Sequence, residues 1–210
     1  HACSYWLPNL ENIQAIIIGG PGATKDYVVR NDYFHHEIAK KIAKTHFDVG
    51  YSNESGVREL VDNAGALMGE IELDAERQIM NRFLAELIKP QPRATYGEMM
   101  LRQALDQGAV DTLLISENMR KNSVEIECGG CGHTWTASVA RTEELPECPA
   151  CGVSNDSHKE LSNISLIDVL SEMAAKSNSE IAFISVDTEE GAQLAHGFGG
   201  LAAILRYPMM

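Results

Sequence analysis

The sequence predicts an α/β fold: an α/β sandwich that carries an inserted zinc ribbon and is preceded by a shorter α/β segment. Strand-like runs alternate with helical patterns along the second half of the chain, and this alternation is typical of a partly parallel sheet covered by helices. Two Cys-x-x-Cys pairs interrupt the alternation. With 210 residues, of which 44% are hydrophobic, the chain is long enough for one large domain or two small ones.

The first segment contains two predicted strands separated by a helix. A β-branched run over residues 14–19 ends in glycines, which predicts a buried strand. The turn over 19–25 lacks the residue spacing of a P-loop. Apolar spacing then predicts a helix over 31–44 and a second strand over 46–51.

Two further helices are predicted before the sandwich. Asn53 or Ser55 can cap the first, in which apolar residues recur at helical spacing from 57 to 71. The second runs over 74–88 and ends at a segment with two prolines, which cannot continue a helix.

The sandwich itself is predicted from six segments. The expected helices cover 99–107, 165–178 and 189–196, and the expected strands cover 110–116, 180–186 and 201–207.

The zinc ribbon is predicted over residues 122–160. A Cys-x-x-Cys turn brings two thiolates to one point, and two such turns supply the four ligands of a closed zinc site. Strands over 124–127 and 134–139 would form the hairpin between them. The four predicted ligands are Cys128, Cys131, Cys148 and Cys151.

Other interpretations of these cysteines are weaker. Two disulfides would need an oxidising compartment, and the chain shows no signal-peptide pattern at its start. Four idle thiols at this spacing are improbable by chance. His133 is predicted to lie beside the ligands without being one, and Cys3, the fifth cysteine, receives no role. A structural zinc with four protein ligands leaves no open position for catalysis.

The charge is acidic and uneven. Residues 1–47 carry a net charge of +1 and residues 48–210 a net charge of −14. An acidic body is repelled by a phosphate backbone, which argues against sequence-specific DNA binding and against a nucleic-acid-reading zinc finger. A basic protein partner and a plain solvated surface both remain open. No apolar run has the length of a membrane span, and a cytoplasmic location is expected.

No catalytic motif is found, so the chain is not expected to be an enzyme by itself. The segment Gly197-Phe198-Gly199-Gly200 stands out instead, because glycines at a helix end permit positive φ. Phe198 has two interpretations: an outward aromatic that anchors a partner, or a ring that packs inward on the sheet behind a helix cap.

Four segments resemble one family. The residues from His196 to Tyr207 (HGFGGLAAILRY) are similar to the C-terminal signature of class I peptide chain release factors of archaea and eukaryotes. The runs IIIGGPGATK, DVGYSNESG and VDTLLISE resemble the same family in the same order. The cysteine ribbon resembles the archaeal branch.

The resemblance implies the end of a middle domain over 1–68 and a C-terminal domain over 69–210. It implies a translation termination factor that recognises stop codons and triggers peptidyl-tRNA hydrolysis on the ribosome. The catalytic Gly-Gly-Gln tripeptide and the stop-codon reader of the family do not occur in this sequence, and we expect them upstream.

The resemblance also implies partners. Gly197, Phe198, Gly199, Gly200 and Arg206 match the tail of the domain that docks an elongation-factor-type GTPase. The ribosome and an ABC-type recycling ATPase are further expected partners. Two alternatives remain: the Pelota family of ribosome-rescue factors, which shares the Ala-Ala-Ile-Leu-Arg ending, and a kink-turn RNA-binding module.

Overall fold

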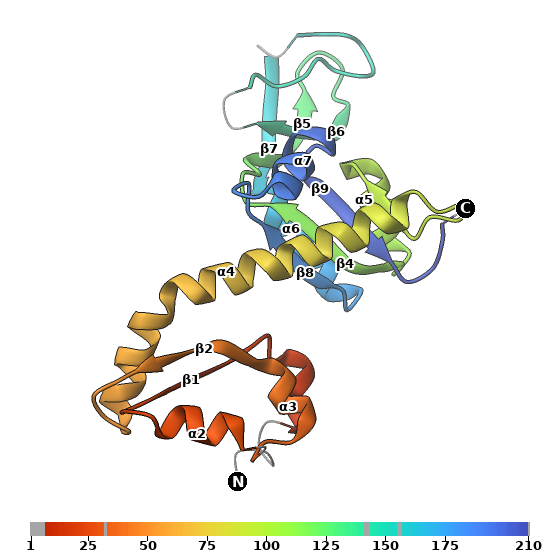
Figure 1. Ribbon diagram of the computed structural model, residues 1–210. Helices are drawn as coiled ribbons and strands as arrows, with labels where there is room; N and C mark the ends of the chain where they lie inside the picture. Colours follow the sequence, from red (N-terminus) through yellow and green to blue (C-terminus); the bar gives the residue numbers. More distant parts are fainter. Residues whose placement is uncertain (1–6, 32, 141–142, 155–156, 210) are drawn as a thin grey trace. The chain divides into compact units, whose positions relative to one another are not determined.

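The structure is a computed structural model that describes residues 7–31, 33–140, 143–154 and 157–209 (Figure 1). The chain divides into two compact units, His1–Ala75 and Glu76–Met210, and each is described by itself. The predicted boundary after residue 68 stays a prediction. Cys3 lies outside the described residues. Within the described ranges, no helix combines the length and the apolar character needed to cross a membrane.

The first unit is built on two parallel strands. β1 and β2 pair with Ile18 opposite His46, and helical segments connect them, as a parallel pair requires. The elements in chain order are η1 (Leu7–Asn12), β1 (Ile16–Gly20), α2 (Thr24–Arg30), α3 (His36–Lys41), β2 (Ile42–Asp48) and the start of α4 (Glu54–Leu87).

The helix predicted over 31–44 is wrong in its extent. α3 covers only His36–Lys41, and the chain turns directly into β2 at Ile42. Ile42 pairs with Ile16 of β1, so sheet formation takes residues that helical spacing alone had assigned to the helix. Ile38, which the helical pattern placed inward, is fully buried.

The two helices predicted from 53 to 88 are one continuous helix, α4. No glycine or proline stands between residues 70 and 75, so nothing in the sequence interrupts the backbone hydrogen bonds there. Asn53 caps the helix as predicted: its Oδ1 accepts the backbone N–H groups of Ser55 and Gly56 at 3.1 and 3.3 Å. α4 ends at Leu87, before the prolines.

The second unit contains a mixed four-stranded sheet, which confirms the mixed α/β class. Its strand order is β3-β9-β4-β8, with β4 parallel to β8 and β9 antiparallel to both β3 and β4. The elements are β3 (Ala94–Tyr96), α5 (Glu98–Asp106), β4 (Val110–Ser116), α6 (Leu166–Lys176), β8 (Glu180–Ile184), α7 (Glu189–Gly197) and β9 (Leu201–Leu205). The three-residue strand β3 was not predicted.

Both faces of this sheet are covered. Successive residues of β4 point to opposite faces, so Leu113 and Ile115 pack in one core cluster with residues of α5 and α6. Leu114 packs on the other face with Met80 and Phe83 of α4. All five of these side chains are fully buried. The sandwich therefore has helices on both sides of one sheet.

The segment between β4 and α6 forms a separate antiparallel sheet, β6-β5-β7. Its strands are β5 (Lys121–Cys128), β6 (Thr134–Ala140) and β7 (His158–Ser165). The predicted hairpin corresponds to β5 and β6. β7 was missed because its sequence is largely polar, and it extends past the predicted end of the ribbon at 160 to lead directly into α6.

Candidate metal centre

Four cysteine sulfurs gather at the end of the β5–β6 hairpin. The Sγ atoms of Cys128 and Cys151 lie 3.6 Å apart, and those of Cys131 and Cys148 lie 3.7 Å apart. All four sulfurs lie within 4.8 Å of one another, and each cysteine is a free thiol. The structure thus brings together the four residues that the sequence predicted, and it pairs them across the two turns.

The first turn is held by its own backbone. The N–H of Cys128 donates to the carbonyl of His133 at 2.9 Å, and the N–H of Gly132 donates back to the carbonyl of Cys128 at 2.8 Å. Gly132 has a φ of +71°, a conformation that glycine adopts without steric cost. These bonds fold the chain so that Cys131 faces the same point as Cys128.

The second turn repeats this arrangement. The N–H of Cys148 donates to the carbonyl of Val153 at 3.1 Å, and the N–H of Gly152 donates to the carbonyl of Cys148 at 2.9 Å. Gly152 has a φ of +70°. Two equivalent turns therefore face one another, each with one buried and one exposed cysteine.

The pKa values of Cys128 and Cys151 are shifted in opposite directions. The backbone N–H of Cys131 stabilises the Cys128 thiolate and lowers the pKa of Cys128 to about 6. The N–H of Val153 lowers the pKa of Cys151, but hydrogen bonding with the Cys131 sulfur and burial outweigh it and raise that pKa to about 12. Deprotonation of Cys128 is therefore favourable, whereas deprotonation of Cys151 is unfavourable unless a bound cation compensates the negative charge. The donor set fits a metal ion.

A small apolar cluster supports the site. Val124, Ile126 and Val139 are buried, and Trp135 packs against them. His158, which the sequence analysis did not single out, places its ring edge-on to Trp135 with the centroids 5.1 Å apart. The polar sequence of β7 contains no pattern from which this position of His158 could have been predicted.

His133 lies beside the four cysteines, in the position that was predicted for it. Its ring stacks on that of Trp135, with the centroids 6.0 Å apart, and it does not belong to the group of close ligand atoms.

The glycine segment after α7 forms a tight turn into β9. The N–H groups of Phe198 and Gly200 both donate to the carbonyl of Leu194, at 3.3 and 2.9 Å. Gly200 has a φ of +79°, and a Cβ atom there would lie 2.8 Å from Cε of Met119. Glycine is therefore required at this position for both conformation and space.

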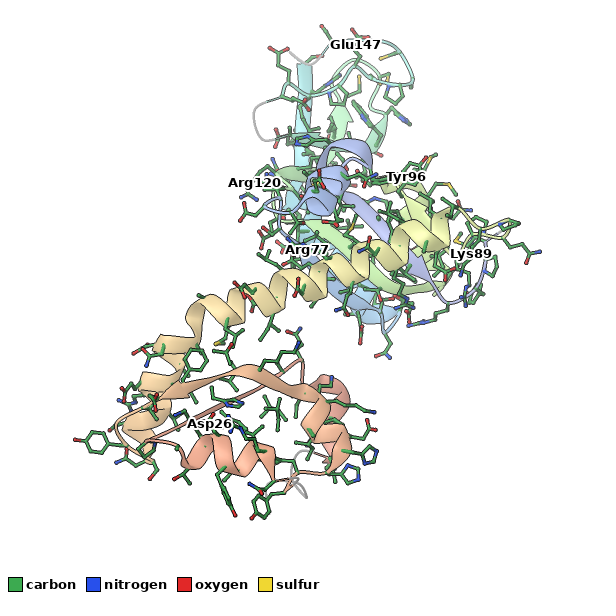
Figure 2. All side chains as sticks on the ribbon, viewed as in Figure 1. Asp26, Arg77, Lys89, Tyr96, Arg120 and Glu147 are labelled. Atoms are coloured by element: carbon green, nitrogen blue, oxygen red, sulfur yellow. The ribbon has the colours of Figure 1, made fainter. Side chains whose placement is uncertain are left out.

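The Phe198 ring packs inward, which agrees with the second of its two interpretations, a ring that packs on the sheet behind a helix cap. It makes edge-on contacts with the rings of Phe83 and Tyr96, at centroid distances of 5.2 and 5.1 Å, and borders the core cluster beneath α7. Figure 2 labels Tyr96, which is itself half exposed. Aromatic pairs of this geometry stabilise a core beyond the area that they bury, which explains the inward position.

Arg206 binds the protein's own backbone. Its guanidinium donates to the carbonyls of Gly108, Ser177 and Asn178, at 3.0, 3.1 and 2.6 Å. Two of these carbonyls follow the C-terminal end of α6, where a positive charge is favourable. The structure thus gives Arg206 a structural role, and a role in partner binding stays a prediction.

The fold and the cluster define an α/β module that carries an inserted four-cysteine ribbon. The chain belongs to the eRF1 family. The family model eRF1 domain 2 matches residues 2–70, and eRF1 domain 3 matches residues 73–209.

Curated relatives support this membership. The chain is 41% identical to "Peptide chain release factor subunit 1" of Thermococcus onnurineus over 215 residues, which cover 99% of this chain and 51% of the relative. It is 40% identical to the protein of the same name from Methanocaldococcus jannaschii, over 96% of this chain and 50% of the relative. The chain spans about half the length of the curated relatives it matches.

Solved structures agree on the fold. The C-terminal domain of the peptide chain release factor from Methanosarcina mazei superposes with a TM-score of 0.61 and 37% identity, covering 75% of this chain and 98% of that domain. A model of ribosome-bound archaeal Pelota and ABCE1 superposes with a TM-score of 0.58, over 97% of this chain and 46% of the Pelota chain. At 17% identity, the second likeness concerns the fold alone.

The inward position of Phe198 predicts a stability effect. We expect Phe198→Ala to lower the free energy of unfolding by about 2 kcal/mol, because it removes two aromatic contacts and leaves a gap beside Phe83. The matched control is Phe183→Ala, since Phe183 on β8 is 48% exposed, and we expect a change within about 0.5 kcal/mol. Urea unfolding measures both. Equal effects of the two substitutions would contradict the packing described here.

Proposed function

We propose that this chain is the second half of an archaeal-type class I release factor and acts in translation termination. The observation that carries the proposal is the 41% identity to a release factor subunit over 99% of the chain. The intact protein would recognise stop codons and trigger hydrolysis of peptidyl-tRNA by the ribosome. In this proposal residues 1–68 end the middle domain and residues 69–210 form the C-terminal domain, with the ribbon inserted over 122–160.

The chain contributes a scaffold and docking surface rather than an enzymatic site. The Gly-Gly-Gln tripeptide through which the family acts does not occur in this sequence. A Pelota-like rescue factor remains the second candidate, because the fold is shared with Pelota. The much higher identity to release factors, about 41% against 17%, favours termination. Action on the ribosome would place the protein in the cytoplasm.

Peptide release by a chimera tests the proposal. We expect a protein that joins the upstream half of the Thermococcus onnurineus relative to this chain to release a peptide from ribosomes stalled at a stop codon. Ribosomes stalled at a sense codon are the control. Failure to release, with the parent relative active in the same assay, would contradict a termination role for this chain.

We propose further that the metal of the ribbon is a structural zinc. A tetrahedron of sulfurs around zinc, with Zn–S distances of about 2.3 Å, has edges of about 3.8 Å. The sulfur pairs Cys128–Cys151 and Cys131–Cys148, at 3.6 and 3.7 Å, are close to this length. Four thiolates around one ion complete its coordination, so the zinc would hold the ribbon together and leave no position for a substrate.

Zinc content and its pH dependence check this assignment. We expect about one zinc per reduced chain. Cys131 and Cys151 have raised pKa values, because the neighbouring thiols and burial outweigh the N–H groups of His133 and Val153 that lower them. Both release a proton on binding, so the affinity should fall by at least about a hundredfold per pH unit from pH 8 to pH 6. Competition with a chelating dye measures this.

Two single substitutions provide the comparison for zinc. Cys131→Ser removes one ligand and should abolish stoichiometric zinc, whereas Cys3→Ser changes the remaining cysteine of the chain and should retain it. A zinc content that is the same in both variants, or that is absent in the unmodified reduced protein, would contradict the zinc centre.

We also propose that the C-terminal domain docks an elongation-factor-type GTPase through the segment Gly197–Gly200 and Arg206, which lie at opposite ends of β9. The support is the match of these residues to the family's tail, together with the exposure of Gly197 and Gly199. Phe198 would act by shaping the turn, and Arg206 by fixing the opposite end of β9 to the segments after α5 and α6. The ribosome and an ABC-type recycling ATPase are the other proposed partners.

A charged substitution at the exposed Gly197 tests the docking surface. A Cβ at Gly197 would meet only Cγ of Gln193 at 3.7 Å, an ordinary contact, so Gly197→Glu should preserve the fold. We expect it to weaken GTPase binding at least tenfold in a titration, because a bulky carboxylate enters the contact. Gly65→Glu, on an exposed and open position of α4, is the matched control. Unchanged affinity of Gly197→Glu would contradict the proposed surface.

A further inference from the structure

The four cysteine sulfurs form two close pairs that cross from one turn to the other. The Sγ atoms of Cys128 and Cys151 lie 3.6 Å apart, and those of Cys131 and Cys148 lie 3.7 Å apart. Cys128 and Cys148 are buried, whereas Cys131 and Cys151 are exposed. Each pair therefore joins the two turns, and each combines one cysteine that is open to solvent with one that is not.

The backbone of the turns keeps the sulfurs of each pair near one another. A Cβ atom at Gly130 would lie 3.2 Å from Cγ2 of Val153, so a glycine in the first turn permits its close approach to the second. The N–H groups of Gly132 and Gly152 each donate to the carbonyl of the first cysteine of their own turn, at 2.8 and 2.9 Å. These bonds fix the shape of both turns.

We propose that the cluster is a site of reversible oxidation by a peroxide, in which Cys128–Cys151 and Cys131–Cys148 become disulfides and the metal is released. The metal release rests on the zinc centre proposed above, whereas the pairing rests on the sulfur positions. A disulfide has an S–S distance of about 2.0 Å, so the sulfurs of each pair approach by about 1.6 Å. Two further observations fit this chemistry: the access to one cysteine of each pair and the short distance to its partner.

The exposed cysteine of each pair reacts first. Its thiolate sulfur attacks one oxygen of hydrogen peroxide, the O–O bond breaks and hydroxide leaves, which gives a sulfenic acid. The thiolate of the buried partner then attacks this sulfur, the S–O bond breaks and a second hydroxide leaves. Two protons, from the thiols or from solvent, convert the hydroxides to water. Each disulfide thus consumes one peroxide molecule, which the two sulfurs reduce by two electrons.

Oxidation exchanges one connection between the turns for another. The thiolate is the form of cysteine that binds a metal ion, and a disulfide has lost it, so the two disulfides release the metal. The same disulfides connect the first turn to the second, as the metal would. The end of the ribbon therefore stays closed in both forms.

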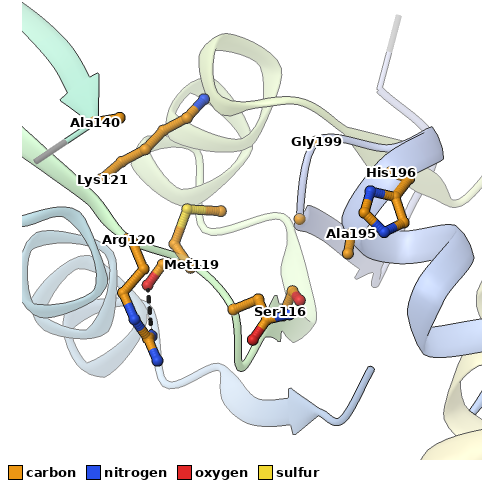
Figure 3. Close-up of a pocket in the computed structure, with 10 residues that line it drawn as sticks. Ser116, Met119, Arg120, Lys121, Ala140, Ala195, His196 and Gly199 are labelled. Atoms are coloured by element: carbon orange, nitrogen blue, oxygen red, sulfur yellow. Dashed lines mark hydrogen bonds between the residues drawn. The ribbon is translucent and has the colours of Figure 1, made fainter. Parts of the chain in front are cut away.

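The base of the ribbon is held without the cysteines. Lys121 at the start of β5 pairs with Ala140 at the end of β6, and Figure 3 shows the two residues beside one another. Arg120 Nη1 donates to the carbonyls of Glu117 and Met119, at 2.8 and 3.1 Å, and the contact with Met119 is drawn dashed in Figure 3. The change is therefore confined to the end of the ribbon that carries the cysteines.

Peptide mapping of the oxidised chain tests the pairing. Trypsin cuts after Arg141, so the cysteines of the first turn fall in peptide 122–141 and those of the second in peptide 142–159. The zinc-loaded chain carries Cys3→Ser, which removes the remaining cysteine. We expect hydrogen peroxide to release about one zinc per chain and to join the two peptides in a mass spectrum recorded without reductant. Dithiothreitol should reverse both changes.

Two double variants separate the proposed pairs from other pairs. Cys131→Ser with Cys148→Ser leaves the pair Cys128–Cys151, whereas Cys131→Ser with Cys151→Ser leaves the two buried cysteines. We expect peroxide to form the disulfide at least about tenfold faster in the first variant, because it retains an exposed sulfur and its close partner. The loss of free thiols with time measures this, and equal rates would overturn the pairing.

The outcomes distinguish this proposal from the zinc centre. A chain that binds no zinc but joins its two peptides on oxidation would contradict the zinc centre and support the oxidation. A chain that binds zinc and forms disulfides only within each turn, so that the two peptides stay separate, would overturn the oxidation proposed here. Conversion of the cysteines to sulfinic acids, which dithiothreitol does not reverse, would overturn it as well.

Discussion

The antiparallel pairing of β9 with β4 is the interaction on which the rest of the second unit depends. Leu201 lies opposite Ile115, and all five residues of β9 are buried. This pairing joins two segments that are far apart in the chain. It brings the Gly200 carbonyl to the N–H of Ser116 at one end, and at the other end it directs Arg206 toward the carbonyls after α5 and α6. The position of the proposed docking turn is a consequence of it.

The ribbon is stabilised in a different way from the sandwich. Among the described residues its apolar cluster has only three buried members, Val124, Ile126 and Val139, which is too few to hold a three-stranded sheet by burial alone. Two cysteine turns of equal geometry face one another there, and a metal ion bound between them, as we propose, would connect the loops. β5 leads the chain out of the sandwich after β4, and β7 leads it back into α6. The insertion therefore leaves the four-stranded sheet continuous.

Much of the sandwich was predictable because burial imposes a regular pattern. The strand over 110–116 is confirmed residue by residue, and the cysteine spacing identified all four members of the cluster. Two of the misses share a cause. The helix predicted over 31–44 lost residues to β2, and the polar strand β7 was overlooked, because in each case pairing with a distant strand decides the structure.

The sequence by itself determined the α/β class, the cysteine cluster and the family, because these depend on residue type and local spacing. Only the tertiary structure decided the direction of Phe198 and the structural use of Arg206. The local pattern left two interpretations of Phe198 open, and the rings of Phe83 and Tyr96, from α4 and β3, select the inward one. Such contacts join residues remote in the chain, and their energies depend on positions that local spacing does not contain.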